Sequence, residues 1–137
     1  MIIDSSALVA ILREESEAAQ FVAIMLSREP VRISAAGYLE TGIVIDGGRN
    51  PASSRRVDSF MADAGISVEP VTPEQARVAR VAYQDFGKGS GHPAQLNFGD
   101  CFAYALAKDK GEPLLFKGTD FDETDVQVVR VDDIVQD

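Results

Sequence analysis

Four acidic residues of this 137-residue chain stand beside apolar segments, where carboxylates are uncommon. They are Asp4, Glu40, Asp100 and Asp120. Carboxylates that come within about 4 to 6 Å of one another repel, and at least one takes up a proton unless a cation lies between them. Ligand sets made only of oxygen suit Mg²⁺ or Mn²⁺, with water and substrate phosphate completing the shell. The four acids therefore suggest a divalent metal pocket.

Each acid also has an ordinary structural explanation. Asp4 and Asp100 could cap the helices that are predicted to begin beside them. Glu40 could reach water or an arginine from the edge of its helix, although glutamate is seldom buried without a partner. Asp120 lies in a polar turn and could simply be solvated. The metal interpretation therefore depends on the four acids meeting at one place.

Short apolar strands and amphipathic helices alternate along the chain. Strands are predicted at residues 1–3, 31–33, 66–68, 114–116 and 128–131, and helices at residues 7–12, 18–26, 35–46, 51–64, 73–86 and 97–107. This alternation predicts a parallel sheet between layers of helices. Asp4 and Asp120 would then follow strands, and ligands of such sheets bind in the crevice outside the strand carboxyl ends. The predicted topology can thus bring the four acids together.

Helical spacing also predicts which side chains are buried. Ser5 or Ser6 is expected to cap the first helix. The buried faces are expected to carry Ala76, Ala79, Tyr83 and Phe86 in the helix at 73–86, and Phe98, Phe102, Ala105 and Leu106 in the helix at 97–107. Cys101 lies on the second of these helices, so we interpret it as an inert core residue rather than a nucleophile.

Composition excludes several classes of function. One histidine and one cysteine rule out a site with several histidine ligands, a cysteine-based zinc site and an intramolecular disulfide. The segment from Gly87 to Ser90 lacks the spacing of a nucleotide-binding phosphate loop. No basic leader or apolar run of about 18 residues is present, which predicts a cytoplasmic protein that does not enter a membrane.

The net charge of −9 argues against nonspecific attraction to nucleic acid, because Lys and Arg supply affinity for phosphate. That argument weakens if many acids are gathered around a divalent cation, which reverses the local charge and can bridge to phosphate. A basic partner is also favoured. The charge therefore fits a nucleic-acid enzyme only if the acids serve a metal.

Four segments resemble those of PIN-domain proteins, specifically VapC-type toxins of bacterial type II toxin–antitoxin pairs. The segments are Ile2–Leu8, Tyr38–Glu40, Leu96–Phe102 and Leu115–Phe121, and they follow the family's order and spacing over nearly the whole chain. The resemblance implies a single PIN domain at 1–137, built as an α/β/α sandwich around a mainly parallel sheet of four to five strands. It also implies Mg²⁺- or Mn²⁺-dependent endoribonuclease activity, homodimerisation and neutralisation by a cognate antitoxin.

Carried over residue by residue, the resemblance places four acids in the catalytic and metal site: Asp4, Glu40, Asp100 and Asp120. Asp4 and Asp100 correspond to direct metal ligands, and Ser6 to a small hydroxyl beside the site. The turn that holds the fourth acid varies within the family, so Asp122 and Asp125 stay open as alternatives to Asp120. On the substrate side, the predicted RNA contacts flank the site in sequence: Lys88, His92 and Lys117.

Two other functions compete with the endoribonuclease. A haloacid-dehalogenase-like phosphatase would also place an aspartate after the first strand, but Asp4 is followed by two serines and not by the Asp-x-Asp motif. A catalytically silent PIN-like module that binds RNA or protein would keep the same fold. The presence of all four acids argues against such a silent module. An assay for divalent-dependent RNA cleavage distinguishes it from the endoribonuclease.

Overall fold

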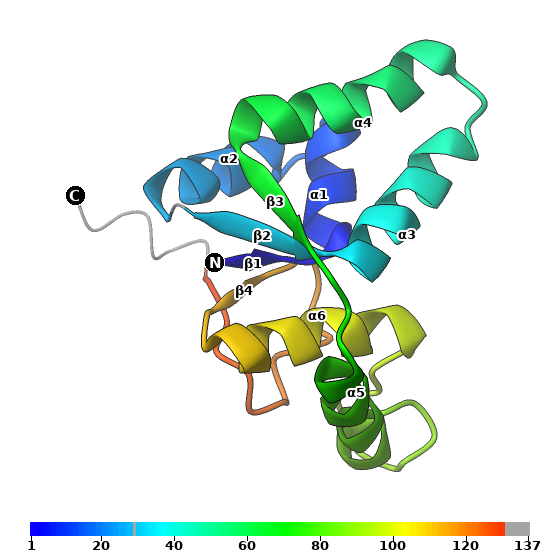
Figure 1. The fold of residues 1–137 in the computed structure, drawn as a ribbon, viewed down its shortest axis with the longest axis vertical. Helices are drawn as coiled ribbons and strands as arrows, with labels where there is room; N and C mark the ends of the chain where they lie inside the picture. Colours follow the sequence, from blue (N-terminus) through cyan, green and yellow to red (C-terminus); the bar gives the residue numbers. More distant parts are fainter. Residues whose placement is uncertain (29, 131–137) are drawn as a thin grey trace.

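A computed structural model describes residues 1–28 and 30–130. Four parallel strands form one sheet in the order β3-β2-β1-β4, with helices on both faces (Figure 1). The strands are β1 (Ile2–Ile3), β2 (Val31–Ser34), β3 (Ile66–Glu69) and β4 (Leu114–Leu115). The helices are α1 (Ser5–Leu12), α2 (Ala18–Ser27), α3 (Ala35–Asp46), α4 (Pro51–Ala64), α5 (Pro73–Phe86) and α6 (Phe98–Lys110). The predicted α/β/α sandwich is confirmed.

Side-chain alternation along the strands divides the core into two parts. Ile3 and Leu115 pack in a cluster with α1, α2, α3 and α4, whereas Ile2 and Leu114 pack with α5 and α6. This split arises because successive side chains of a strand point to opposite faces of the sheet. Figure 1 shows the same two layers, with α1 to α4 on one side and α5 and α6 on the other. Central strands are therefore apolar on both faces, as parallel sheets require.

The structure corrects two predictions at the ends of elements. Helix α1 is capped by Asp4 and not by Ser5 or Ser6, because the Asp4 side chain accepts from the Ser6 backbone N–H. The predicted strand at 128–131 does not form over its described part. Val128 makes only an isolated bridge to Leu114, and Val131 lies outside the described residues. No described helix is long and apolar enough to cross a membrane.

The predicted buried faces of α5 and α6 are partly wrong. Gln75 and Ala82 are buried in α5, while Ala76 is exposed and Tyr83 is 46% exposed. Phe98, which was expected to seat α6 on the sheet, is 79% exposed. Helix α5 packs chiefly against α6, so one helix covers only part of its apolar stripe. The uncovered aromatic side chains therefore border solvent.

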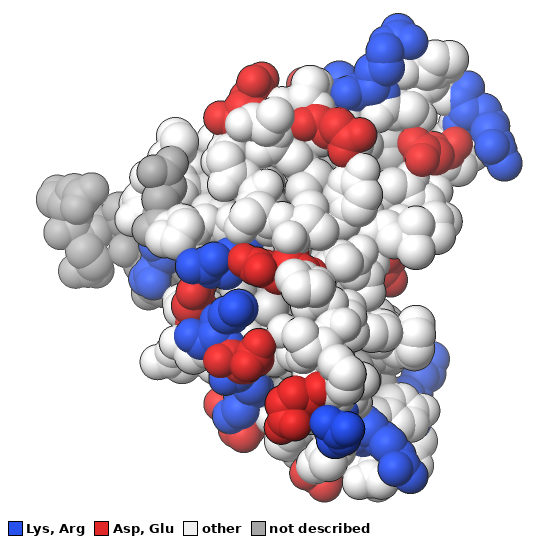
Figure 2. Space-filling model, in the orientation of Figure 1, with Lys and Arg blue, Asp and Glu red and all other residues white. Residues whose placement is uncertain are grey.

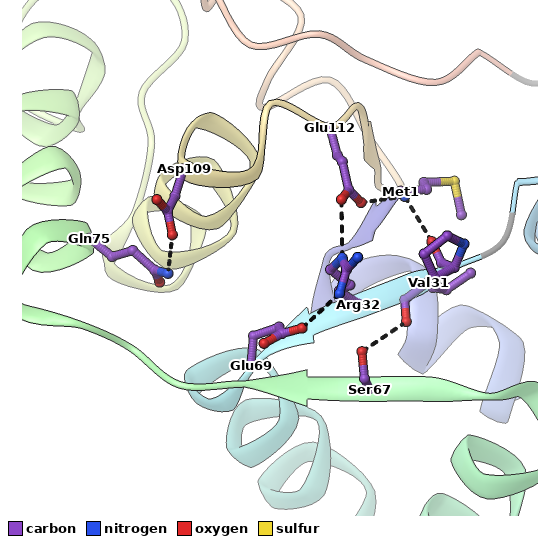
Figure 3. Close-up of polar contacts among 9 residues, drawn as sticks. Met1, Val31, Arg32, Ser67, Glu69, Gln75, Asp109 and Glu112 are labelled. Atoms are coloured by element: carbon purple, nitrogen blue, oxygen red, sulfur yellow. Dashed lines mark hydrogen bonds and ion pairs between the residues drawn. The ribbon is translucent and has the colours of Figure 1, made fainter.

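A group of paired charges connects β2, the end of β3 and the segments that precede β1 and β4; we call it the Arg32 network (Figure 3). The amine of Met1 donates to Glu112 Oε1 at 2.6 Å and to the Pro30 carbonyl at 2.9 Å. Arg32 donates to Glu112 Oε2 at 3.1 Å and to Glu69 Oε1 at 3.0 Å. Burial opposes ionisation of Glu112, but hydrogen bonds from the Met1 amine and Arg32 outweigh it and lower the pKa of this carboxyl. Positive and negative charges are thus matched here.

Candidate active site

One open pocket, which we call the acid pocket, has a volume of about 360 Å³ and is lined by five carboxylates. Glu15 is one of them and pairs with Lys117, and the other four are the acids predicted from the sequence. They are Asp4, Glu40, Asp100 and Asp120. Asp4 follows β1 and Asp120 follows β4, and these two strands pair in parallel with Ile3 opposite Leu115. Glu40 comes from α3 and Asp100 from the first turn of α6. Parallel pairing therefore places both strand ends, and the acids that follow them, at one edge of the sheet.

Asp4 is both the cap of α1 and a buried wall of the acid pocket. Its Oδ2 accepts from the Ser6 N–H at 3.0 Å and from the Ser6 hydroxyl at 2.6 Å. The Ser6 hydroxyl in turn accepts from the Lys117 N–H at 3.0 Å, which ties the end of β1 to the segment after β4. Burial raises the pKa of Asp4 to about 6, with the charges of Glu40 and Asp120 adding to the rise and Ser6 opposing it.

Asp100 is held by a reciprocal cap at the start of α6. The Asn97 N–H donates to Asp100 Oδ2 at 3.0 Å, and the Asp100 N–H donates to Asn97 Oδ1 at 2.9 Å. Burial raises the pKa of Asp100 to about 7, while the Asn97 N–H opposes the rise and Asp4 and Asp120 add to it. In the absence of a cation, the fold therefore favours the protonated form of Asp100 more than water does.

Glu40 is positioned by two small residues that sequence reasoning did not assign to the site. The Ser5 hydroxyl donates to Glu40 Oε1 at 2.5 Å. A Cβ at position 99 would lie 2.5 Å from Glu40 Oε2, so Gly99 leaves space that the carboxylate fills. The available signals were the serine after Asp4 and the glycine before Asp100. Neither identifies Glu40 as its partner, because that contact joins elements distant in sequence.

The geometry favours Asp120 as the fourth acid of the pocket. Asp120 lines the acid pocket, and its nearby charge helps to raise the pKa values of Asp4 and Asp100. Asp122 instead pairs with Arg130 at 3.0 Å. Asp125 accepts from the Tyr104 hydroxyl at 2.5 Å and from Lys108 at 3.1 Å. Both alternatives are therefore engaged by side chains elsewhere.

The donor atoms of the acid pocket fit a hard divalent cation, since the polar side chains that face it are mainly carboxylates and hydroxyls. Lys117 also lines the pocket, but its ammonium pairs with Glu15 and lies 3.4 Å from Glu17. Among residues 1–28 and 30–130, no three His, Cys, Asp or Glu side chains already converge as a metal site. The pocket thus offers suitable ligands without a closed coordination shell.

The three predicted RNA contacts lie in different environments. Lys117 lines the acid pocket, whereas Lys88 lines an apolar groove between α5 and α6. His92 packs edge-on against Phe86 at 4.9 Å between ring centroids, and its Nδ1 accepts from the Ala94 N–H at 3.0 Å. These contacts give His92 a structural role in the loop. Lys88 and Lys117 therefore line two different hollows.

Cys101 is buried, as predicted, and its thiol donates to the Asn97 carbonyl at 3.3 Å. Burial raises the pKa of this thiol, and the Asp100 charge adds to the rise, so the reactive thiolate is disfavoured. Asn97 itself was not assigned a role from sequence. It lines both the acid pocket and the apolar groove.

Comparisons with known proteins agree with this geometry. A PIN domain family model matches residues 1–127. The chain is 57% identical over 127 residues to Ribonuclease VapC28 of Mycobacterium tuberculosis, covering 93% of this chain and 96% of the relative. It is 51% identical over 128 residues to Ribonuclease VapC42 of the same species, covering 93% and 97%.

Two solved structures share the fold. The crystal structure of Mycobacterium tuberculosis VapC20, described as a sarcin-ricin loop cleaving toxin, has a TM-score of 0.73 at 18% identity and covers 94% of this chain and 98% of its own. A toxin–antitoxin complex from Klebsiella pneumoniae has a TM-score of 0.70 at 20% identity, with coverage of 95% and 96%. The family match and the close relatives show that this chain belongs to the PIN-domain family, among the VapC ribonucleases.

Proposed function

We propose that this chain is a Mg²⁺- or Mn²⁺-dependent endoribonuclease that acts as the toxin of a toxin–antitoxin pair. Its membership of the VapC ribonucleases supports the class of activity. The observation that carries the proposal is the meeting of four carboxylates from separate elements, two of them buried with pKa values of about 6 and about 7. Buried acids that repel one another gain most from a divalent cation.

In this proposal Asp4 and Asp100 are direct metal ligands, and Glu40 and Asp120 complete the acidic set. Ser6 and Asn97 orient the two buried carboxylates, because each donates to one carboxylate oxygen. For Asp4 this leaves Oδ1 without a hydrogen bond from any described residue, so that oxygen is available to a ligand. When bound, a divalent cation supplies a more acidic water and stabilises charge on a phosphodiester.

A cleavage assay on structured RNA tests this proposal. Wild-type protein should cut RNA with Mg²⁺ or Mn²⁺ and stop in EDTA. Asp100→Asn should be at least about 1,000-fold slower, since several kcal/mol of charge stabilisation is lost and each 1.36 kcal/mol is tenfold in rate. Asp63→Asn removes a charge from an exposed position of α4 and serves as the matched control. Wild-type rates from purified Asp100→Asn, with contaminating nuclease excluded, would contradict the mechanism.

A catalytically silent PIN-like binding module is the second candidate. It is favoured by one observation, that no three of the described acids form a ready-made metal site. The same assay separates the two functions. Wild-type protein that binds RNA but shows no divalent-dependent cleavage would be such a module.

The proposed partners are RNA, a cognate antitoxin and a second copy of the chain, all in the cytoplasm. The acid pocket suits an antitoxin peptide whose Arg or Lys side chain enters it and competes with metal. Exposed apolar side chains outside the pocket could pack against protein partners; they include Leu26, Leu39 and Ile43. Growth rescue on co-expression with the neighbouring reading frame tests the antitoxin, and sedimentation equilibrium tests the dimer.

A further inference from the structure

A second hollow of about 590 Å³, which we call the α5–α6 groove, opens between the two helices of the lower layer in Figure 1. Apolar and aromatic side chains form most of its walls, and two cations stand among them. The residues that matter here are Ala79, Arg80, Tyr83, Lys88, Phe98 and Phe102. None of the four acids lines this groove. It is therefore chemically different from the acid pocket.

The α5–α6 groove and the acid pocket are neighbours. Asn97 lines both, and it also holds Asp100 through the reciprocal cap of α6. The next residue, Phe98, faces the groove, and the one after it, Gly99, contacts Glu40 of the pocket. A polynucleotide that places one phosphate in the acid pocket would therefore bring an adjoining nucleotide to the groove.

The aromatic walls of the groove are exposed but held in place. Phe98 is 79% exposed and meets Phe102 edge to face at 4.9 Å between ring centroids. Tyr83 is 46% exposed, and its hydroxyl donates to the Lys88 carbonyl at 3.0 Å. A Cβ at Gly87 would lie 2.5 Å from the Tyr83 ring, so the absent side chain lets the loop pack against that ring. Exposed aromatic faces of this kind are suited to stacking with nucleobases.

The cations of the groove are available to a ligand. Arg80 and Lys88 form no ion pair with a described residue, whereas Lys117 of the acid pocket is paired with Glu15 and Glu17. On the face drawn in Figure 2, Lys and Arg side chains at the lower left lie among Asp and Glu. The chain has a net charge of −9, so a second copy would also be acidic. Two cations that pair with no described acid, beside aromatic walls, therefore complement a polyanion such as RNA better than a second copy.

Building on the proposed function, we propose that the α5–α6 groove binds an unpaired nucleobase next to the scissile phosphate of single-stranded RNA. Phe98 and Tyr83 provide the stacking surface, and Arg80 and Lys88 neutralise the adjoining phosphates. Stacking tolerates every base because every base has a flat face. The groove therefore selects unpaired nucleotides over duplex and supplies affinity rather than base identity.

An abasic scan tests the groove in a protein that does not cut its ligand. Fluorescence anisotropy is measured in Mg²⁺ with the full-length Asp100→Asn protein and short single-stranded RNAs that each lack one base. The RNA that lacks its base at one position near the scissile phosphate should bind about 5- to 150-fold more weakly than intact RNA. The reason is that one stacked base contributes about 1–3 kcal/mol. Adding Phe98→Ala should weaken intact RNA by a similar factor and remove sensitivity to the missing base.

Matched variants separate stacking from general apolarity. Phe98→Trp should retain affinity and Phe98→Leu should lose it, since only the aromatic ring stacks. Val81→Ala, on a different face of α5, and Lys110→Gln, at the far end of α6, should bind as the parent does. Replacing Arg80 and Lys88 by Gln should reduce the dependence of log Kd on log salt, by about 0.7 for each phosphate that is no longer neutralised.

Two results would overturn the inference. The first is an abasic scan in which no missing base weakens binding. The second is a Phe98→Leu variant that binds RNA as the parent does but is a monomer where the parent is a dimer in sedimentation equilibrium. That result would assign the groove to a second copy of the chain. Wild-type cleavage of RNA, measured in parallel, decides the proposed function separately. The scan reads binding in a protein that need not cleave, so either conclusion can fail without the other.

Discussion

The Arg32 network and the acid pocket both contain buried or half-buried acids, but they differ in charge balance. In the Arg32 network two carboxylates face two cations, and the pKa of Glu112 is lowered by its partners. In the acid pocket five carboxylates face one ammonium, that of Lys117, which already pairs with Glu15 of the pocket and with Glu17, and the pKa values of Asp4 and Asp100 are raised. The first arrangement is complete without a ligand, whereas the second is not.

This difference shows which charged groups stabilise the folded state and which do not. Matched charges connect β2, the end of β3 and the segments before β1 and β4, and none of these residues lines the pocket, where acids repel one another. A site that must bind a cation cannot also satisfy its acids with internal partners. We therefore expect the two regions to respond oppositely to pH and to substitution.

The largest expected contrast is a gain in stability on removing an acid from the pocket. The folded-state pKa of Asp100 is about 7, above its ordinary value of 3.8, so the fold favours the protonated form. Its stabilising contribution is full below pH 3.8 and is lost as the pH rises through 7. In EDTA at pH 8, Asp100→Asn should therefore raise the free energy of unfolding by about 2–4 kcal/mol, at about 1.4 kcal/mol per pKa unit.

Urea unfolding at several pH values measures this effect. The gain should shrink toward pH 4, and Mg²⁺ should stabilise wild type more than the variant, because a ligand of the folded state adds RT ln(1 + [L]/Kd). Asp63→Asn should show no such pattern. A variant that is less stable than wild type at pH 8 would show that repulsion in the pocket is relieved by some other means.

A smaller contrast concerns the space that Glu40 occupies. Gly99→Ala would push a methyl group into the Glu40 carboxylate, which is the far end of a flexible side chain and is held by the Ser5 hydroxyl. We expect the fold to survive and RNA cleavage to fall about 10- to 100-fold, as for other losses of ligand positioning. Gly42→Ala is the control, because its Cβ would meet only Asp46 at 3.9 Å. If the two alanine variants cleave RNA at the same rate, the position of the Glu40 carboxylate does not matter for cleavage.

Breaking the Arg32 network should have a modest effect of the opposite sign. Glu112→Gln removes the shared partner of Arg32 and the Met1 amine, and should lower the free energy of unfolding by about 1 kcal/mol or less at pH 7. The pKa of Glu112 is depressed, so its stabilisation is present above its ordinary value of 4.5 and disappears as the pH falls further. Urea unfolding at pH 7 and pH 3 should show this loss only at the higher pH.

The smallest expected effect is on RNA affinity, and it tests whether Lys117 contacts the substrate. Glu15→Gln removes one of the two acids that hold its ammonium. RNA should then bind about two- to five-fold more tightly at low salt, the scale of one exposed ion pair. Anisotropy in the Asp100→Asn background measures this change. An unchanged Kd at all salt concentrations would show that Lys117 does not reach the substrate.

Much of the fold was predictable because its signals are local. Apolar runs followed by turn residues predicted five strands, of which the structure confirms four, and caps such as Thr72 with Pro73 predicted helix starts that the structure confirms. The strand-then-acid order at Asp4 and Asp120 likewise indicated a common edge. The exposed face of α5 was mispredicted because periodicity does not reveal how much of an apolar stripe a single neighbouring helix covers.

The sequence by itself determined the fold class and predicted the candidate acids and their relation to strand ends, since these depend on residue type and short spacing. Only the tertiary structure decided that Asp120 and not Asp122 or Asp125 lines the pocket, that Ser5 and Gly99 position Glu40, and that Phe98 borders a groove. Those facts depend on contacts between segments that parallel strand pairing and helix packing bring together, and such contacts leave no local pattern in the chain.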